Sequence, residues 1–131
     1  MLVADTHAII WFLSGATRPS PAARAAIEAA LRSGGSILIA TISVVEAAYL
    51  IERGRIDPST SDRLDRALAD PSGGLAPVEL DQAEARSLRE IPRNLIPDMP
   101  DRIIAATALD RNLPLFTADG KIRSSGVATI W

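Results

Sequence analysis

Apolar segments in which hydrophobic and polar residues do not alternate recur along this chain, and helical patterns separate them. Val3-Ala4 is the first such segment, and "SILIAT" at residues 36–41 is the next. A strand that is apolar on both sides needs a cover on both faces of its sheet, which is typical of parallel sheets connected by helices. The sequence therefore predicts an α/β protein: a three-layer α/β/α sandwich around a mostly parallel central sheet.

Further strands are expected at residues 73–80, 113–118 and 126–131. Capping residues and prolines mark the starts of the intervening helices. The expected helix starts are at Thr6 or His7, after Ser20, after Ser43, after Asp57, after Asp81 and in the turn that contains Pro100.

Composition limits the kinds of chemistry that the chain can perform. Its 131 residues predict a single domain over residues 1–131. The absence of cysteine and the single histidine exclude disulfides, cysteine nucleophiles and a multi-histidine zinc site within one chain. A formal net charge of −2 provides no global basic field for nucleic acid. Without a recognisable signal peptide or membrane-spanning run, the expected location is the cytoplasm.

Two aspartates directly follow apolar strands. Asp5 comes after the first strand, and Asp119 comes after "LPLFTA" at residues 113–118. The carboxyl ends of parallel strands meet at one sheet edge, where such sheets bind their ligands. Each aspartate could instead cap the helix that follows it. Two acids in matching positions favour a shared functional site.

Glu46 is the only charged residue between Ile37 and Ile51, in a helical segment that is apolar nearly all round. An unpaired buried carboxylate is unfavourable unless it binds a proton or a cation. Ser43 lies three residues earlier, so a capping box is an alternative explanation. The capping box and a functional role are compatible, and both stay open here.

Two further acids, Asp98 and Asp101, surround the start of the helix after Pro100. Asp101 shares a helical face with apolar Ile104 and Ala105, so we expect it at the rim of the core. Asp98 has the position of a cap and is the secondary candidate. His7 follows Asp5 closely, and a structural role at the helix start is favoured for it over a role as a base.

Acids from four separated segments are thus expected beside one sheet edge. Clustered carboxylates repel one another and raise one another's pKa, so a divalent cation among them would make the arrangement tolerable. A ligand set made of oxygen atoms favours Mg²⁺ or Mn²⁺. Metals held by carboxylates characteristically serve phosphoryl chemistry.

Four segments in order also resemble the motifs of PIN-domain ribonucleases, especially the VapC-type toxins of bacterial type II toxin–antitoxin systems. These segments are "VADTHAIIWFL", "ISVVEAAYL", "DRIIAATAL" and "LFTADGKI", and they extend over nearly the whole chain. By this resemblance the acidic quartet that performs catalysis and binds Mg²⁺ or Mn²⁺ is Asp5, Glu46, Asp101 and Asp119. Asp98 matches a further metal-binding acid, and Thr6 and Thr117 match supporting hydroxyl residues.

The resemblance implies a metal-dependent endoribonuclease in which activated water cleaves RNA phosphodiesters. It also implies a small VapB-like antitoxin as partner, a homodimer, and a possible toxin–antitoxin hetero-oligomer, with no membrane. Arg102, beside Asp101, is the arginine selected as a contact to RNA phosphate or to the tail of the antitoxin.

Two alternatives from other functional classes remain. Asp5, Thr117 and Lys121 would suit a receiver-like signalling domain that is phosphorylated on aspartate, although that pattern does not require Glu46. The other alternative is a catalytically inactive PIN-like binding module, which would show no saturable metal binding.

Overall fold

The computed structural model describes residues 1–131 and contains one five-stranded sheet. The strand order is β3-β2-β1-β4-β5, and every neighbouring pair is parallel. The strands are β1 (Leu2–Ala4), β2 (Ile37–Ala40), β3 (Leu75–Val78), β4 (Leu115–Phe116) and β5 (Thr129–Ile130). The predicted parallel sheet is confirmed.

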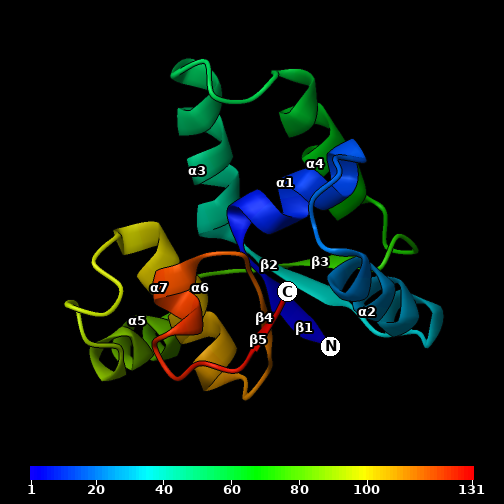
Figure 1. The fold of residues 1–131 in the computed structure, drawn as a ribbon. Helices are drawn as coiled ribbons and strands as arrows, with labels where there is room; N and C mark the ends of the chain where they lie inside the picture. Colours follow the sequence, from blue (N-terminus) through cyan, green and yellow to red (C-terminus); the bar gives the residue numbers. More distant parts are fainter.

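Helices connect the strands and cover both faces of the sheet. They are α1 (Thr6–Ser14), α2 (Pro21–Arg32), α3 (Thr41–Glu52), α4 (Ser59–Ala69), α5 (Gln82–Ser87), α6 (Met99–Asp110) and α7 (Gly120–Arg123), with a 3₁₀ helix η1 (Leu88–Glu90) after α5. Figure 1 shows α1, α2 and α4 on one side of the sheet and α5, α6 and α7 on the other. None of these helices combines the length and hydropathy needed to cross a bilayer.

Two separate hydrophobic cores lie between the sheet and the helices on its two faces. Leu2 and Ala4 point into one core, which they share with residues of α1, α2 and α4. Val3, between them, points into the other core, against residues of α6 and α7. Successive side chains of a strand face opposite sides of the sheet, so an apolar strand without alternation supplies both cores. The predicted α/β/α sandwich is confirmed.

The helix starts follow the predicted caps with two exceptions, Asp57 and Ser43. Pro58 is the N-cap of α4, although the Asp57 carboxylate accepts from the Ser59 amide at 2.8 Å. The Ser20 hydroxyl accepts a hydrogen bond from the Ala23 amide at 3.1 Å, and the Asp81 carboxylate accepts one from the Glu84 amide at 2.9 Å. The predicted Ser43 cap is wrong, because α3 already begins at Thr41. Strand β2 passes directly into the helix, with Ala40 in extended geometry at the N-cap position. No loop remains in which Ser43 could act as a cap.

The connections reverse direction at β1, which has β2 on one side and β4 on the other. The chain moves outward from β1 to β2 and β3, and then returns to the opposite side of β1 as β4. In open α/β sheets such a switch point leaves a crevice beyond the carboxyl ends of the strands, where ligands bind. The ends of β1 and β4 therefore mark the place where a site is expected.

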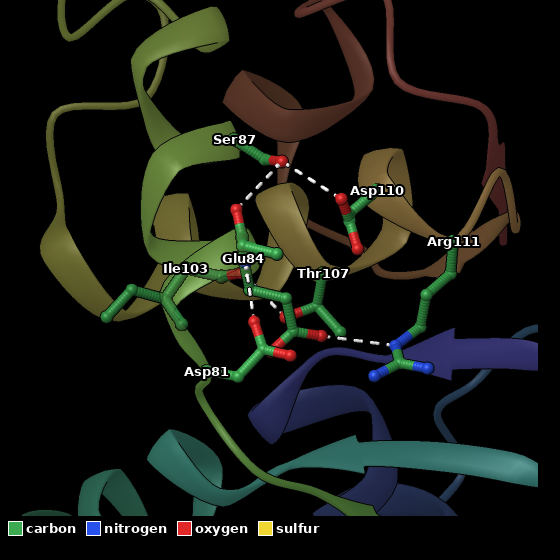
Figure 2. Close-up of polar contacts among 8 residues, drawn as sticks. Asp81, Glu84, Ser87, Ile103, Thr107, Asp110 and Arg111 are labelled. Atoms are coloured by element: carbon green, nitrogen blue, oxygen red, sulfur yellow. Dashed lines mark hydrogen bonds and ion pairs between the residues drawn. The ribbon is translucent and has the colours of Figure 1, made fainter.

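A buried ion pair connects α5 to the end of α6, on the face of the sheet opposite α1, α2 and α4 (Figure 2). The Arg111 Nε donates to the Glu84 Oε1 at 3.1 Å, and the Glu84 side chain is only 1% exposed. Beside it, the Ser87 hydroxyl donates to the Asp110 carboxylate, and the Asp81 carboxylate accepts from the backbone amide of Glu84. Glu84 has no other side-chain partner, because its Oε2 is buried without a hydrogen bond.

We expect Arg111→Ala to lower the free energy of unfolding by about 3 kcal/mol, because it leaves the buried Glu84 charge uncompensated. Urea unfolding followed by circular dichroism measures this loss. Arg32→Ala is the matched control, since it breaks an exposed pair with Glu28 at 3.8 Å and should cost less than about 0.5 kcal/mol. Equal losses in the two variants would show that the α5–α6 pair contributes no more than a surface contact.

Candidate functional site

The ends of β1 and β4 bring Asp5 and Asp119 to the same sheet edge. Thr117, at the end of β4, joins them: its hydroxyl donates to the Asp5 Oδ2 at 2.8 Å and accepts from the Asp119 amide at 3.0 Å. The backbone amide of Asp5 also donates to the Phe116 carbonyl at 2.9 Å. Thr117 therefore fixes the relative position of the two acids.

The capping explanation holds for Asp119 and not for Asp5. One carboxylate oxygen of Asp119 accepts hydrogen bonds from the amides of Lys121 and Ile122 at 2.8 and 3.0 Å, at the start of α7. Asp5 precedes α1, but its side chain makes no capping hydrogen bond. Asp5 is 4% exposed, and its Oδ1 is buried without a partner. Capping therefore does not explain why this carboxylate is buried.

Glu46 projects from the second turn of α3, whose start lies beside the start of α1 (Figure 1). Because Ser43 lies inside the helix, the capping box that it would form with Glu46 is absent. The Glu46 side chain is half-buried, and its Oε1 has no hydrogen-bond partner. The hydroxyl of Thr6 lies near this carboxylate without completing a hydrogen bond of standard geometry. Glu46 is thus a second acid with an unsatisfied oxygen.

Asp98 and Asp101 reach the site from the start of α6. Asp98 is the N-cap, and its carboxylate accepts from the Asp101 amide at 3.5 Å. Asp101 lies in the first turn, and the predicted apolar face that includes Ile104 and Ala105 is buried. The helix start thus holds Asp101 at the rim of the core, with Asp98 next to it.

These acids line one cavity of about 480 Å³. Its charged and aromatic lining residues are Asp5, His7, Trp11, Arg18, Glu46, Asp98, Asp101 and Asp119. Two groups within it have ligand atoms that all lie within 4.8 Å of one another: Asp5 with His7 and Glu46, and Glu46 with Asp98 and Asp101. Glu46 belongs to both groups and therefore links Asp5 to the acids of α6. Asp119 lines the same cavity but belongs to neither group.

Burial and mutual repulsion raise the pKa of three of these carboxyl groups. Loss of hydration is the main cause for each one. For Asp5, the hydrogen bond from Thr117 partly offsets the rise in pKa. For Asp101, the charges of Asp5, Asp98 and Glu46 add to desolvation, and the pKa rises to about 7. A nearby cation would relieve this repulsion and also satisfy the free oxygens of Asp5 and Glu46.

Arg102 hydrogen-bonds to backbone carbonyl groups outside the cavity. Its guanidinium donates to the carbonyl oxygens of Leu88 and Ile91 at 3.1 and 2.9 Å, and it does not line the cavity. Arg102 follows Asp101 by one helical position, which turns its side chain by about 100° toward α5 and η1. Both hydrogen bonds use the Nη2 group of Arg102, and they direct the guanidinium away from the cavity. The contact to phosphate or to the antitoxin stays a prediction. Lys121, which the receiver alternative needs near Asp5, is also absent from the lining.

Three residues at the cavity carried little signal in the sequence. His7 is exposed and joins a potential ligand group, whereas a structural role was favoured for it. Trp11 is half-buried and lines the cavity, although nothing in its apolar segment indicates this position. Arg18 lies in a segment without a motif, and only the fold brings it to the acids. The position of His7 two residues after Asp5 was the one usable signal.

Comparison with known proteins agrees with this architecture. The PIN domain profile matches residues 2–126. Among solved structures, VapBC2 from Rickettsia felis bound to a DNA fragment from its promoter is similar with a TM-score of 0.72 and 16% identity, covering 98% of this chain and 96% of that one. A toxin–antitoxin complex from Klebsiella pneumoniae gives a TM-score of 0.69 and 20% identity, covering 100% and 97%.

A third similar structure, FitAcB from Neisseria gonorrhoeae, has a TM-score of 0.60 and 20% identity, covering 100% of this chain and 97% of that one. At these identities the structural likeness establishes the fold. A search of curated proteins finds no significant match. The profile match extends over nearly the whole chain and includes every acid of the cavity. The chain therefore belongs to the PIN-domain family.

Proposed function

We propose that this chain is a Mg²⁺- or Mn²⁺-dependent endoribonuclease and the toxin of a toxin–antitoxin pair, acting in the cytoplasm as one domain. The observation that carries the proposal is the meeting of five carboxylates from four segments in one cavity. PIN domains are generally nucleases. Two of the similar structures are a VapBC2 complex and a toxin–antitoxin complex.

The residues present suit a hard divalent cation. Asp5 Oδ1 and Glu46 Oε1 are buried oxygens without hydrogen-bond partners, and carboxylate oxygens are the ligands that Mg²⁺ and Mn²⁺ prefer. Asp5, Glu46 and Asp101 are the residues that would hold the ion, with Asp98 and Asp119 beside them. When bound, such an ion would lower the pKa of water and neutralise charge on the phosphate in the transition state.

The surrounding residues keep these oxygens in place. Thr117 holds Asp5 in one orientation by donating to its Oδ2, which leaves Oδ1 free. Asp119 is held by the amides at the start of α7, and Asp98 is held at the start of α6. Because the pKa of Asp101 is raised to about 7, a part of these carboxyl groups is protonated at neutral pH, and a bound cation would displace that proton. Preorganised side chains of this kind favour a well-defined position for a phosphodiester.

A small antitoxin and a second copy of the chain are the proposed protein partners. Val45 and Tyr49 on α3 and Met99 on α6 are exposed apolar side chains that line a cleft next to Glu46. Exposed apolar patches of this kind are typical of protein interfaces. We propose this surface for the homodimer, and sedimentation of a Tyr49→Arg variant as a monomer would support that assignment.

Incubation of the purified protein with total cellular RNA tests the proposed activity. We expect new 5′ ends at defined positions when Mg²⁺ or Mn²⁺ is present and none when the metal is chelated, because the free carboxylates alone repel phosphate. Mapping of the 5′ ends by sequencing measures the outcome. Intact RNA together with no saturable Mn²⁺ binding would instead identify a catalytically inactive binding module.

A further inference from the structure

Arg18 is the only lysine or arginine among the residues that line the acid cavity. It lies between α1 and α2, and its side chain is exposed. The guanidinium carbon lies 5.1 Å from the centre of the Trp11 ring. The two ion pairs of the molecule join Arg32 to Glu28 and Arg111 to Glu84, and no side-chain hydrogen bond uses Arg18. A permanent cation thus borders five carboxylates without being neutralised by any of them.

Aromatic contacts hold this arginine in place. Trp11 is half-buried on α1 and packs near Trp131, with ring centres 5.8 Å apart. Trp131 in turn lies 5.5 Å from the ring of Phe116 at the end of β4. Pro19, the residue after Arg18, is buried. The backbone and the aromatic support are therefore anchored in the core, while the N–H groups of the guanidinium stay free.

We propose that Arg18, supported by Trp11, is a positioning residue that binds a phosphate of single-stranded RNA next to the phosphodiester that is cleaved. This inference rests on the proposed nuclease function. A planar guanidinium with free donors binds phosphate through two parallel hydrogen bonds, and stacking on an aromatic ring limits the freedom lost on binding. Proteins that bind single-stranded nucleic acids also commonly combine positive side chains with aromatic rings.

The charges that line the cavity favour a ligand with more than one negative group. The carboxylates repel any anion unless a cation lies between them and the ligand, whereas Arg18 attracts an anion directly. A ligand that fills the cavity would therefore offer one negative group to a cation held by Asp5, Glu46 and Asp101 and another to the guanidinium of Arg18. Adjacent phosphates of an RNA strand meet both requirements. An acidic protein segment is the competing ligand that the test must separate.

Arg18→Ala should weaken RNA binding about 10- to 100-fold and raise KM by a similar factor, while kcat changes less than about threefold. Binding is measured in Mn²⁺ by fluorescence anisotropy of a labelled, non-cleavable short single-stranded RNA, and KM and kcat are measured in Mn²⁺ with a cleavable RNA. The slope of log affinity against log salt should fall by about 0.7, which corresponds to the loss of one contact to a single strand. Arg18→Lys should lose part of the affinity, because it keeps the charge but not the two-point geometry.

Matched variants separate this role from a structural one. Arg24 also stacks on an aromatic ring, 5.1 Å from the centre of Phe12, but it does not line the cavity. Arg24→Ala should therefore leave RNA affinity unchanged. Trp11→Phe should retain RNA affinity, and Trp11→Ala should behave like Arg18→Ala. Equal melting temperatures for Arg18→Ala and the wild type show that lost binding does not reflect unfolding.

Three outcomes would overturn the inference. The first is wild-type RNA affinity and KM in a folded Arg18→Ala variant. The second is an equal loss of RNA affinity in Arg24→Ala. The third is a poly-glutamate peptide that binds in an Arg18-dependent way while RNA affinity is independent of Arg18, which would assign the arginine to an acidic protein partner. Arg18-dependent RNA binding without any cleavage would contradict the proposed nuclease activity and would support Arg18 as an RNA contact.

Discussion

Asp5→Asn should reduce RNA cleavage on the order of 10³-fold or more while the protein stays folded. Asp5 is the most buried acid of the cavity, and its free Oδ1 is the oxygen best placed to bind a cation. An amide has the same shape and its oxygen can still accept from Thr117, which now donates to Oδ2 at 2.8 Å. The substitution thus removes a charge without creating a void.

In chelator, the melting temperature of the Asp5→Asn variant should equal or exceed that of the wild type. The pKa of Asp5 is raised by burial, so the ionised carboxylate is unfavourable where it stands. Cleavage of a labelled RNA and thermal unfolding measure the two effects. Asp65→Asn, on the exposed face of α4, is the matched control and should alter neither. Wild-type cleavage by a folded Asp5→Asn protein would remove the basis of the proposed function.

The second large effect is the dependence of protein stability on pH and on bound metal. In chelator, the free energy of unfolding should fall by about 2 kcal/mol as the pH rises from 4 to 7, after allowance for solvent screening. The sign follows from Asp101, whose pKa is raised from 3.8 to about 7 in the folded protein. Between these values the folded state binds more protons than the unfolded state, so deprotonation favours unfolding. The raised pKa values of Asp5 and Glu46 act in the same direction.

Mn²⁺ should reverse this dependence, because the carboxylates must lose their protons to bind it. At 100 times the dissociation constant and pH 7.5, the melting temperature should rise by about 10 °C, and much less at pH 5. Differential scanning calorimetry across pH, with and without Mn²⁺, measures both effects. Asp101→Asn should flatten the pH dependence and weaken the response to metal. Stability that increases with pH in chelator, or a melting temperature insensitive to millimolar Mn²⁺, would refute the carboxylate site.

Asp57 and Asp70 do not interfere with this measurement. Hydrogen bonds from Ser59 and Ser72 lower the pKa of these exposed carboxyl groups. Their contribution to stability is present above the usual pKa of an aspartate and is lost only as the pH falls below about 4. The pH window from 4 to 7 therefore reports the acids of the cavity.

Much of the architecture was readable in the sequence because local patterns reflect it directly. Apolar strands such as "SILIAT" require cover on both faces, so the parallel sheet and its two helical layers followed from hydrophobicity alone. Ser20 and Asp81 marked helix starts because their side chains satisfy free amide groups within three residues. Asp5, Glu46, Asp98, Asp101 and Asp119 were selected because each is a charge in apolar surroundings or at an element boundary, and all five line one cavity.

Contacts across long sequence separations could be established only by the folded chain. Nothing near Arg102 in the sequence indicates that its Nη2 group donates to the carbonyl groups of Leu88 and Ile91. Arg18 lies over the ring of Trp11, and both residues line the cavity. No local motif encodes the contact between Arg18 and Trp11 or their place beside the acids. Ser43 failed as a cap because β2 enters α3 without a loop. A residue type fixes which interactions a side chain is able to make, and the packing of distant elements selects which of them it makes.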